Sequence, residues 1–449
     1  MRLGKQSTSS RFLSAFTIFV RMKRLVFLLL FGIWMSSALG QKEQSIVVSD
    51  KLQTLRCGDL IVPVRVGATD TAMYYPRLAG KRVALLANHT SMIGERHLVD
   101  ILHARGFDVT AIFAPEHGFR GTADPGEHVG GSVDAATGIP IRSLYDGNTR
   151  RPSDEAMHSF DVLVVDMQDV GVRFYTYYIA MLRMMDACAD FGQAVIVLDR
   201  PNPLGGRKVE GPLVQDGFFS FVSQYRIPYV YGLTCGELAM LLNGEGMIGK
   251  PCNLHVVAME GWKRDMVYED TGLQWIPSSP HIPQAETAFF YPASGIVGDF
   301  GYLSIGVGYT IPFQMFAAEW IDAEQFADSL NALKLPGVIF RPIHVKPFYS
   351  VGQGKQLHGV QVHLTKYPDA PLTDIQFYVM QEIARLYPDR AVLANADTAR
   401  FRMMDQVTGS DYVRKTFAAR NRFEDIRAYW YKDVAPFRTL SRKYYLYGE

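Results

Sequence analysis

The stretch "KRVALLANHTSMIGERHLVDILHARGFDVTAIFAPEHG", residues 81–118, decides the fold class. It contains two apolar runs, 81–91 and 107–118, separated by the amphipathic segment 97–106, which Gly106 closes as a helix C-terminus would be closed. A strand, a helix and a second strand in this order are typical of neighbouring parallel strands joined by a helical crossover. The stretch therefore predicts a parallel sheet with helices packed against it.

The alternation of strand and helix patterns continues along the first half of the chain. Residues 160–171 and 193–203 are apolar runs of strand length, whereas 177–192 and 234–246 have helical patterns. Helices that join parallel strands cover both faces of the sheet. We therefore expect an α/β fold, a Rossmann-like, doubly wound, mostly parallel sheet, in a domain that spans residues 53–300.

The second half of the chain has a different pattern. Two helix patterns and two strand patterns follow, at 322–337, 373–388, 338–349 and 357–368. They predict a second, smaller α+β C-terminal domain over residues 301–449. The aromatic and basic segment 427–449 is expected to pack back on the body of the protein.

Composition limits the class of protein. The chain has 449 residues, 48% hydrophobic and 20% charged, with a net charge of +1, which is typical of a globular protein and argues against a nucleic-acid partner. Its four cysteines, at 57, 188, 235 and 252, form no CxxC pair. The sequence therefore predicts free thiols and no cysteine-based metal site.

The N-terminal segment resembles a targeting signal. A basic start, an apolar run over 25–34 and small residues up to Gly40 predict a secretory signal peptide over 1–40, in which 1–21 is an upstream extension if Met22 is the true start. Because Gln41 follows in place of a lipoprotein cysteine, we expect an exported protein, periplasmic or secreted. No later segment is apolar enough to remain as a membrane span after cleavage.

The sequence gives no support for a nucleotide cofactor. After the first expected strand the chain reads Asn88-His89-Thr90-Ser91, so the GxGxxG fingerprint of dinucleotide sites is missing, and no Walker motif occurs elsewhere. We therefore expect no cofactor, despite the Rossmann-like pattern.

Polar residues stand where the expected strands end. In open parallel sheets, ligands bind beyond the C-terminal ends of the strands. The four strand patterns of the first half end at Asn88, Glu116, Asp166 and Asp199. One such end would be compatible with an ordinary solvated loop, but four at one edge favour a binding or catalytic site.

The segments after these strands supply further candidate binding residues. Aromatic rings stack on sugar faces, and polar side chains bind hydroxyl groups, so the combination suits a carbohydrate; for the tyrosines, packing at a helix start is an equal alternative. The candidates are His117, Arg120, Asp124, Gln168, Asp169, Arg173, Tyr175, Tyr177, Arg200 and Asn202.

Hydrolysis of a glycosidic bond normally requires two carboxyl groups, an acid and a base or nucleophile. Glu116 has an apolar setting, Ala114-Pro115 before it and Gly118-Phe119 shortly after, which favours a protonated acid. We take Asp166 and Asp199 as its catalytic partners. The wider set for the second role is Asp124, Asp166, Asp169, Asp199 and Glu210.

Other catalytic chemistries have weaker support. No HxH, HExxH or HxxxH pattern falls on an expected helix, so no metal ligands are assigned, although a metal-dependent hydrolase with ligands from separate loops is an alternative. A serine nucleophile would be expected in a GxSxG elbow, which is absent.

Several motifs resemble a known family. In order, they are "GKRVALLANHTS", "HLVDIL", "FAPEHGFRG", "DVGVRFYTY", "VLDRPNPLGG", "VEGPL", "GELAMLLNGE" and "MEGWKR". This series is similar to the exo-β-N-acetylmuramidases, glycoside hydrolase family 171. The resemblance implies a Rossmann-like domain with a smaller C-terminal domain, and an exported enzyme that releases N-acetylmuramic acid from the non-reducing end of peptidoglycan fragments. It also implies Glu116 as the catalytic acid.

The chain departs from the family pattern at 291–313, "YPASGIVGDFGYLSIGVGYTIPF". Gly298 or Asp299 replaces a usual glutamate, two usual arginines are absent, and His281 stands where an asparagine is usual. We include His281 among the candidate binding residues. Because arginine binds carboxylates specifically, the change motivates an alternative, a non-catalytic or altered-specificity glycan-binding protein on the same fold.

Overall fold

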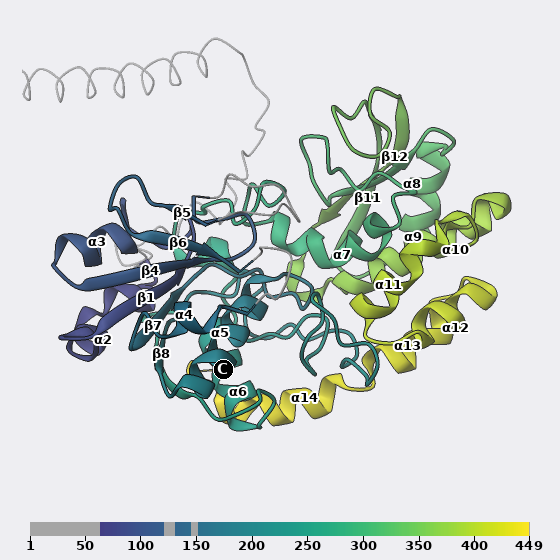
Figure 1. Cartoon of the computed structure of the whole chain (residues 1–449). Helices are drawn as coiled ribbons and strands as arrows, with labels where there is room; N and C mark the ends of the chain where they lie inside the picture. Colours follow the sequence, from purple (N-terminus) through teal and green to yellow (C-terminus); the bar gives the residue numbers. More distant parts are fainter. Residues whose placement is uncertain (1–62, 121–130, 145–150, 449) are drawn as a thin grey trace, which may run out of the picture. The chain divides into compact units, whose positions relative to one another are not determined.

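A seven-stranded sheet forms the core of the N-terminal half of the computed structural model (Figure 1). The strand order is β5-β6-β4-β1-β7-β8-β9, and every neighbouring pair is parallel except β5 and β6. The strands are β1 (Arg82–Ala87), β4 (Asp108–Ala114), β5 (Ser132–Val133), β6 (Pro140–Ser143), β7 (Val162–Asp166), β8 (Ala194–Leu198) and β9 (Asn253–Val257).

The topology is doubly wound. From β1 the chain builds β4 and then β6 on one side, and returns to add β7, β8 and β9 on the other. The direction of winding therefore reverses next to β1, and in such sheets the ligand crevice opens at that point, beyond the carboxyl ends of the strands. The expected Rossmann-like, mostly parallel sheet is confirmed.

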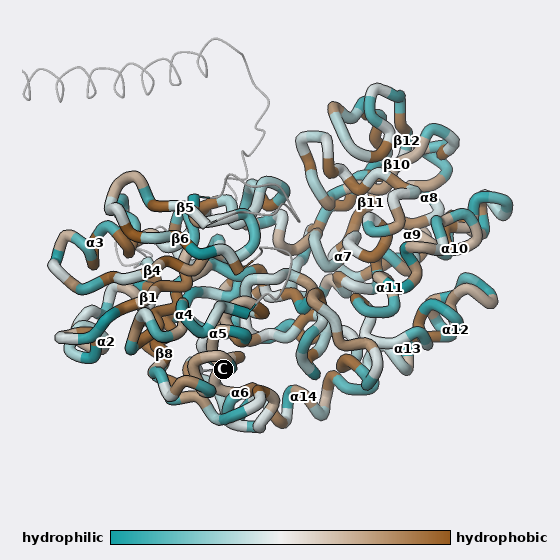
Figure 2. The backbone as a smooth tube through the Cα atoms, viewed as in Figure 1, coloured by the Kyte–Doolittle hydropathy of each residue, from teal (hydrophilic) through white to brown (hydrophobic). Residues whose placement is uncertain are grey.

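Alternate side chains of each strand enter two cores. On one face, Val83 and Leu85 pack with α2 (Thr71–Leu78) and α3 (Leu98–Ala104). On the other face, Leu86 and Val165 pack with residues of α4 (Asp154–Met157), α5 (Tyr177–Phe191) and α6 (Cys235–Gly244). In Figure 2, much of the backbone of the central strands has the brown colour of hydrophobic residues. Burial on both faces explains why these strands are continuous apolar runs.

A second, antiparallel sheet lies in the C-terminal half, in the order β10-β12-β11. Its strands are β10 (Met315–Ala318), β11 (Val338–Val345) and β12 (Leu357–Leu364), and its helices are α7 (Thr287–Asp299), α8 (Ala323–Ala332) and α9 (Leu372–Leu386). Phe316, Phe340 and Val362 belong to the same apolar core as Leu86 of β1. The two halves therefore share one core, and Ile61–Glu449 form one compact unit.

The end of the described chain returns to the central sheet. Short helices α10 (Val392–Asn395), α11 (Phe401–Thr408), α12 (Tyr412–Arg420), α13 (Glu424–Tyr431) and α14 (Val434–Ser441) follow one another. Trp430 is fully buried, and its indole N–H donates to Thr373 Oγ1 at 2.9 Å. The Tyr447 hydroxyl donates to Asp199 Oδ2 at 2.6 Å. The aromatic tail thus packs on the body, as expected.

The structure describes residues 63–120, 131–144 and 151–448. The expected signal peptide and Asp124 lie outside these ranges. Within them, no helix is long and apolar enough to cross a membrane.

Candidate active site

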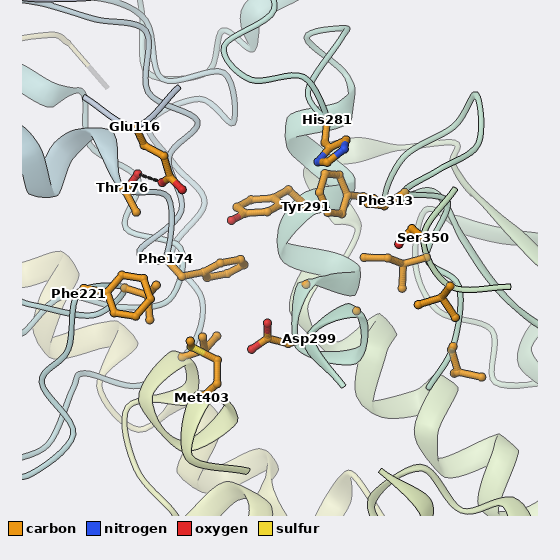
Figure 3. A pocket seen from close by; sticks show the side chains of 18 residues that line it. Glu116, Phe174, Thr176, Phe221, His281, Tyr291, Asp299, Phe313, Ser350 and Met403 are labelled. Carbon is orange, nitrogen blue, oxygen red and sulfur yellow. Dashed lines mark hydrogen bonds between the residues drawn. The ribbon is translucent and has the colours of Figure 1, made fainter. Parts of the chain in front are cut away.

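A cavity of about 390 Å³ opens beyond the carboxyl end of β4. One side is formed by Glu116, Thr176 and Phe174, and the other by Tyr291 and Asp299 of α7 (Figure 3). The remaining lining side chains are mostly apolar, and they include Phe221, Val222, Leu303, Ile305, Val307, Phe313, Val351, Met403 and Val407. The volume lies within the range of small-ligand sites.

A tight turn places Glu116 in this wall. β4 ends at Ala114, and the Gly118 N–H donates to the Pro115 carbonyl at 3.1 Å. His117 has φ 70°, a conformation that glycine or asparagine usually adopts, so the turn is locally strained. The Thr176 hydroxyl donates to Glu116 Oε2 at 2.5 Å, which fixes the half-buried carboxylate at the cavity.

Asp299 lies on the opposite wall, at the last position of α7. Its Oδ2 is buried and has no hydrogen-bond partner among the described residues. Burial raises the pKa of Asp299, and the charge of Arg400, an exposed residue outside the cavity lining, acts in the opposite direction. The cavity therefore contains a second carboxyl group with an open acceptor.

Glycines in α7 allow close packing around the cavity. A Cβ on Gly295 would come within 2.7 Å of the Phe174 ring, and one on Gly298 within 2.2 Å of Ile305. Phe174 and Tyr291 pack with ring centroids 4.5 Å apart. Burial first, and then the charge of Glu116, raise the pKa of Tyr291 well above its usual range, so this hydroxyl stays protonated and can donate.

Most of the sequence-predicted residues form a hydrogen-bonded platform beside the cavity. Asp166, at the end of β7, pairs with Arg200 through bonds of 2.5 and 3.0 Å, and both side chains are buried. Asn88 Oδ1 accepts from the hydroxyl of Thr90 at 2.6 Å. The Thr90 hydroxyl in turn accepts from the N–H of Gln168 at 2.9 Å. The strand ends therefore do converge on one edge, where they bond to one another.

Asp199 is buried in the same edge and does not line the cavity. It accepts hydrogen bonds from the hydroxyls of Thr234 and Tyr447 and from the Gly236 N–H, at 2.6–2.8 Å. Burial raises its pKa to about 6. The geometry assigns Asp199 to holding α6 and the aromatic tail against β8.

Residues of the β7–α5 connection are held in the same way. Asp169 accepts from the Tyr231 hydroxyl at 2.5 Å and the Gly171 N–H at 2.8 Å, and burial raises its pKa to about 6. Arg173 is fully buried and donates to three carbonyl oxygens, including that of Val407 in α11 at 2.7 Å. Burial lowers the pKa of Arg173 to about 10.

The other predicted residues have structural contacts as well. Glu210 accepts from the N–H of Thr373 at 2.8 Å, in the first turn of α9. Asn202 donates to the Leu233 carbonyl at 2.9 Å. Arg120 pairs with Asp134 at 2.7 Å. His117, Tyr175 and Tyr177 are buried, and none of the three lines the cavity.

Of the predicted site residues that the structure describes, two line the cavity, Glu116 and His281. His281 Nε2 lies 3.1 Å from the Tyr349 hydroxyl, and the two rings are stacked. Thr176 and Tyr291 had no distinguishing signal in the sequence. Asp299 had one, its place in the segment 291–313 that departs from the family pattern; in the structure it ends helix α7.

Among the described residues, no three His, Cys, Asp or Glu side chains are grouped as metal ligands would be. The arrangement can supply proton transfer from Glu116, a donor hydroxyl from Tyr291 and an acceptor from Asp299.

Comparisons with known proteins agree with this architecture. Models of the N-terminal and C-terminal parts of the exo-β-N-acetylmuramidase NamZ match residues 83–286 and 289–447. The chain is 38% identical over 379 residues to the peptidoglycan β-N-acetylmuramidase NamZ of Bacillus subtilis strain 168, covering 83% of this chain and 89% of that protein.

Solved structures agree as well. A DUF1343 family protein of Bacteroides fragilis NCTC 9343 is 56% identical with a TM-score of 0.83, covering 86% of this chain and 100% of the other. A second protein of that family and strain is 32% identical with a TM-score of 0.67, covering 86% and 99%. The chain therefore belongs to the exo-β-N-acetylmuramidase family NamZ and is a glycoside hydrolase.

Proposed function

We propose that this glycoside hydrolase releases N-acetylmuramic acid from the non-reducing end of peptidoglycan fragments, with Glu116 as the general acid, after export from the cytoplasm. The observation that supports this best is the placement of Glu116 at the cavity, held by Thr176 on a strained turn at the end of β4. The activity of the Bacillus subtilis relative and the signal-like pattern at 1–40 support the substrate and the export.

In this proposal, Glu116 protonates the glycosidic oxygen while the sugar lies against Phe174 and Tyr291. The bond between the anomeric carbon and that oxygen breaks, and the leaving sugar takes the proton. Water then adds to the anomeric carbon. It does so either directly, with the second carboxylate taking its proton, or after that carboxylate has formed a glycosyl-enzyme, with the ionised Glu116 taking the proton as water displaces the carboxylate.

Of the carboxylates predicted for that second role, together with Asp299, two remain. Asp166, Asp169, Asp199 and Glu210 are occupied by hydrogen bonds outside the cavity lining. Asp299 lines the cavity, and Asp124 belongs to the segment outside the described residues. The variants Asp299→Asn and Asp124→Asn distinguish the two, because only loss of the true partner should lower kcat by about 100-fold or more.

The deciding test is the hydrolysis of a chromogenic β-glycoside of N-acetylmuramic acid by the purified protein. We expect turnover by the wild type and a loss of about 100- to 10,000-fold in Glu116→Gln, the usual contribution of general acid catalysis. Asp265→Asn, an exposed acid-to-amide change outside the cavity, is the matched control and should keep full activity. An inactive wild type, or a fully active Glu116→Gln, would contradict the proposal.

A further inference from the structure

The cavity has an unusual charge composition for an enzyme that acts on an acidic sugar. Among the described residues that line it are two carboxylates, Glu116 and Asp299, and no lysine or arginine. An N-acetylmuramic acid unit with a free lactyl carboxylate would thus bring a further acidic group into a space that already holds two acidic side chains and no cationic one.

Asp299 is the group that such a charge would meet on the α7 side. Its Oδ2 is buried without a partner among the described residues, and the cavity that it lines has a mostly apolar lining, which includes Leu303, Ile305 and Met403. An acceptor of this kind gains from a hydroxyl or amide N–H of a ligand and is repelled by another carboxylate. Apolar walls strengthen both effects because they lower the local dielectric constant.

The lactyl group loses its charge when its carboxyl is joined to a peptide by an amide bond. That linkage also provides an N–H donor for an acceptor such as Asp299. A peptide stem must extend from the cavity into solvent, and the loop after β11 has both cavity-lining and exposed residues. Ser350 and Val351 of this loop line the cavity, whereas the preceding Phe348 and Tyr349 are 68% and 49% exposed.

We propose that the cavity selects muramyl units whose lactyl carboxyl is amide-linked, as in peptide-bearing muropeptides, over units with a free lactyl carboxylate, and that Asp299 is the specificity-determining residue. This inference rests on the proposed muramidase function and names the substrate class within it. The discrimination expected is about tenfold, the repulsion of two unit charges roughly 10 Å apart at an effective dielectric constant near 20.

Two ligands test the selectivity, the methyl β-glycosides of N-acetylmuramic acid and of its lactyl N-methylamide. Their binding to Glu116→Gln is measured by calorimetry at pH 7, so that the result does not depend on turnover. The amide should bind about tenfold more tightly. In Glu116→Gln/Asp299→Asn the preference should shrink toward equality, whereas Glu116→Gln/Asp265→Asn, the matched control, should keep it.

Equal or tighter binding of the free acid overturns the inference, as does no measurable binding of either glycoside, or a preference that survives Asp299→Asn. The proposed function fails separately, if the wild type hydrolyses neither of the corresponding chromogenic glycosides. A protein that turns over both at equal rates and binds both equally would therefore be a muramidase without this selectivity.

Discussion

Two neighbouring regions of this molecule use the same residue types in opposite ways. At the carboxyl ends of β7 and β8, Asp166 and Asp199 are buried, and every one of their carboxylate oxygens accepts a hydrogen bond. In the cavity nearby, Asp299 keeps an open acceptor and Glu116 receives the Thr176 hydroxyl. Carboxylates thus serve both to build the platform and to line the cavity, and their hydrogen-bond partners distinguish the two uses.

The largest difference should appear when the platform loses its ion pair. Asp166→Ala leaves the buried Arg200 guanidinium without its carboxylate, and loss of one partner of a buried pair costs about 3–5 kcal/mol of unfolding free energy. Urea denaturation measures it. Asp265→Ala, whose contact with Arg207 is exposed, is the control and should change stability by less than about 0.5 kcal/mol. A change below about 1 kcal/mol for Asp166→Ala would contradict the structural role.

If Asp199 is buried as described, its carboxyl group should make the free energy of unfolding depend on pH. Burial raises its pKa to about 6 from a usual value of 3.8, so the folded state retains a proton that the unfolded state releases between these values. The stability of the wild type relative to Asp199→Asn should therefore rise as the pH falls from about 7 to about 4, by about 1–3 kcal/mol. Denaturation series at several pH values measure this difference, and a flat difference would show that Asp199 is not buried as described.

On the cavity side, removal of the Thr176 hydroxyl should affect catalysis more than folding. Thr176→Val has nearly the same shape but no donor for Glu116, so kcat/KM should fall by about tenfold, as expected for one hydrogen bond worth roughly 1 kcal/mol or somewhat more. Steady-state kinetics with the chromogenic glycoside check it. Thr234→Val, which removes a donor from the platform carboxylate Asp199, is the comparison and should lower stability instead. If both variants lose only stability, the two regions do not differ as proposed.

The smallest effect should come from Asp299→Asn on stability. Because Asp299 Oδ2 has no partner among the described residues, the substitution removes no favourable contact of that oxygen. The unfolding free energy should change by less than about 0.5 kcal/mol or rise slightly. A loss above about 2 kcal/mol in urea denaturation would place Asp299 with the platform rather than with the cavity.

The sequence was sufficient for the four adjacent strands β4, β1, β7 and β8, because they are continuous apolar runs and the helices between them have a clear amphipathic period, whereas β5, β6 and β9 lie in no expected run. β1, β4, β7 and β8 lie within the four expected runs, and α3, α5 and α6 within the expected helices. Helix α7 was not predicted, since its glycines and Pro292 resemble loop composition. Tertiary contacts with α9 and the cavity wall sustain it.

The site was predictable only in part, because tertiary contacts decide the role of each polar residue. Convergence of polar strand ends follows from topology, and it led to Glu116. Whether a given carboxylate faces a ligand depends on partners distant in sequence, such as Tyr447 for Asp199 and Arg200 for Asp166. The spacing of neighbouring residues in the sequence does not reveal such distant partners. Position at the end of an expected strand therefore indicated Asp166 and Asp199 as strongly as it indicated Glu116.

The bond between Tyr447 and Asp199 joins residues 248 positions apart. During synthesis, β8 and its buried acid are made long before the tyrosine that completes their hydrogen bonding. Until the tail is made, Asp199 Oδ2 therefore has the Thr234 hydroxyl as a donor but lacks that of Tyr447. A chain cut before Tyr447 should accordingly lose this hydrogen bond and the packing of Tyr447 on Trp262, and should be less stable than the full chain even though the residues that line its cavity are all present.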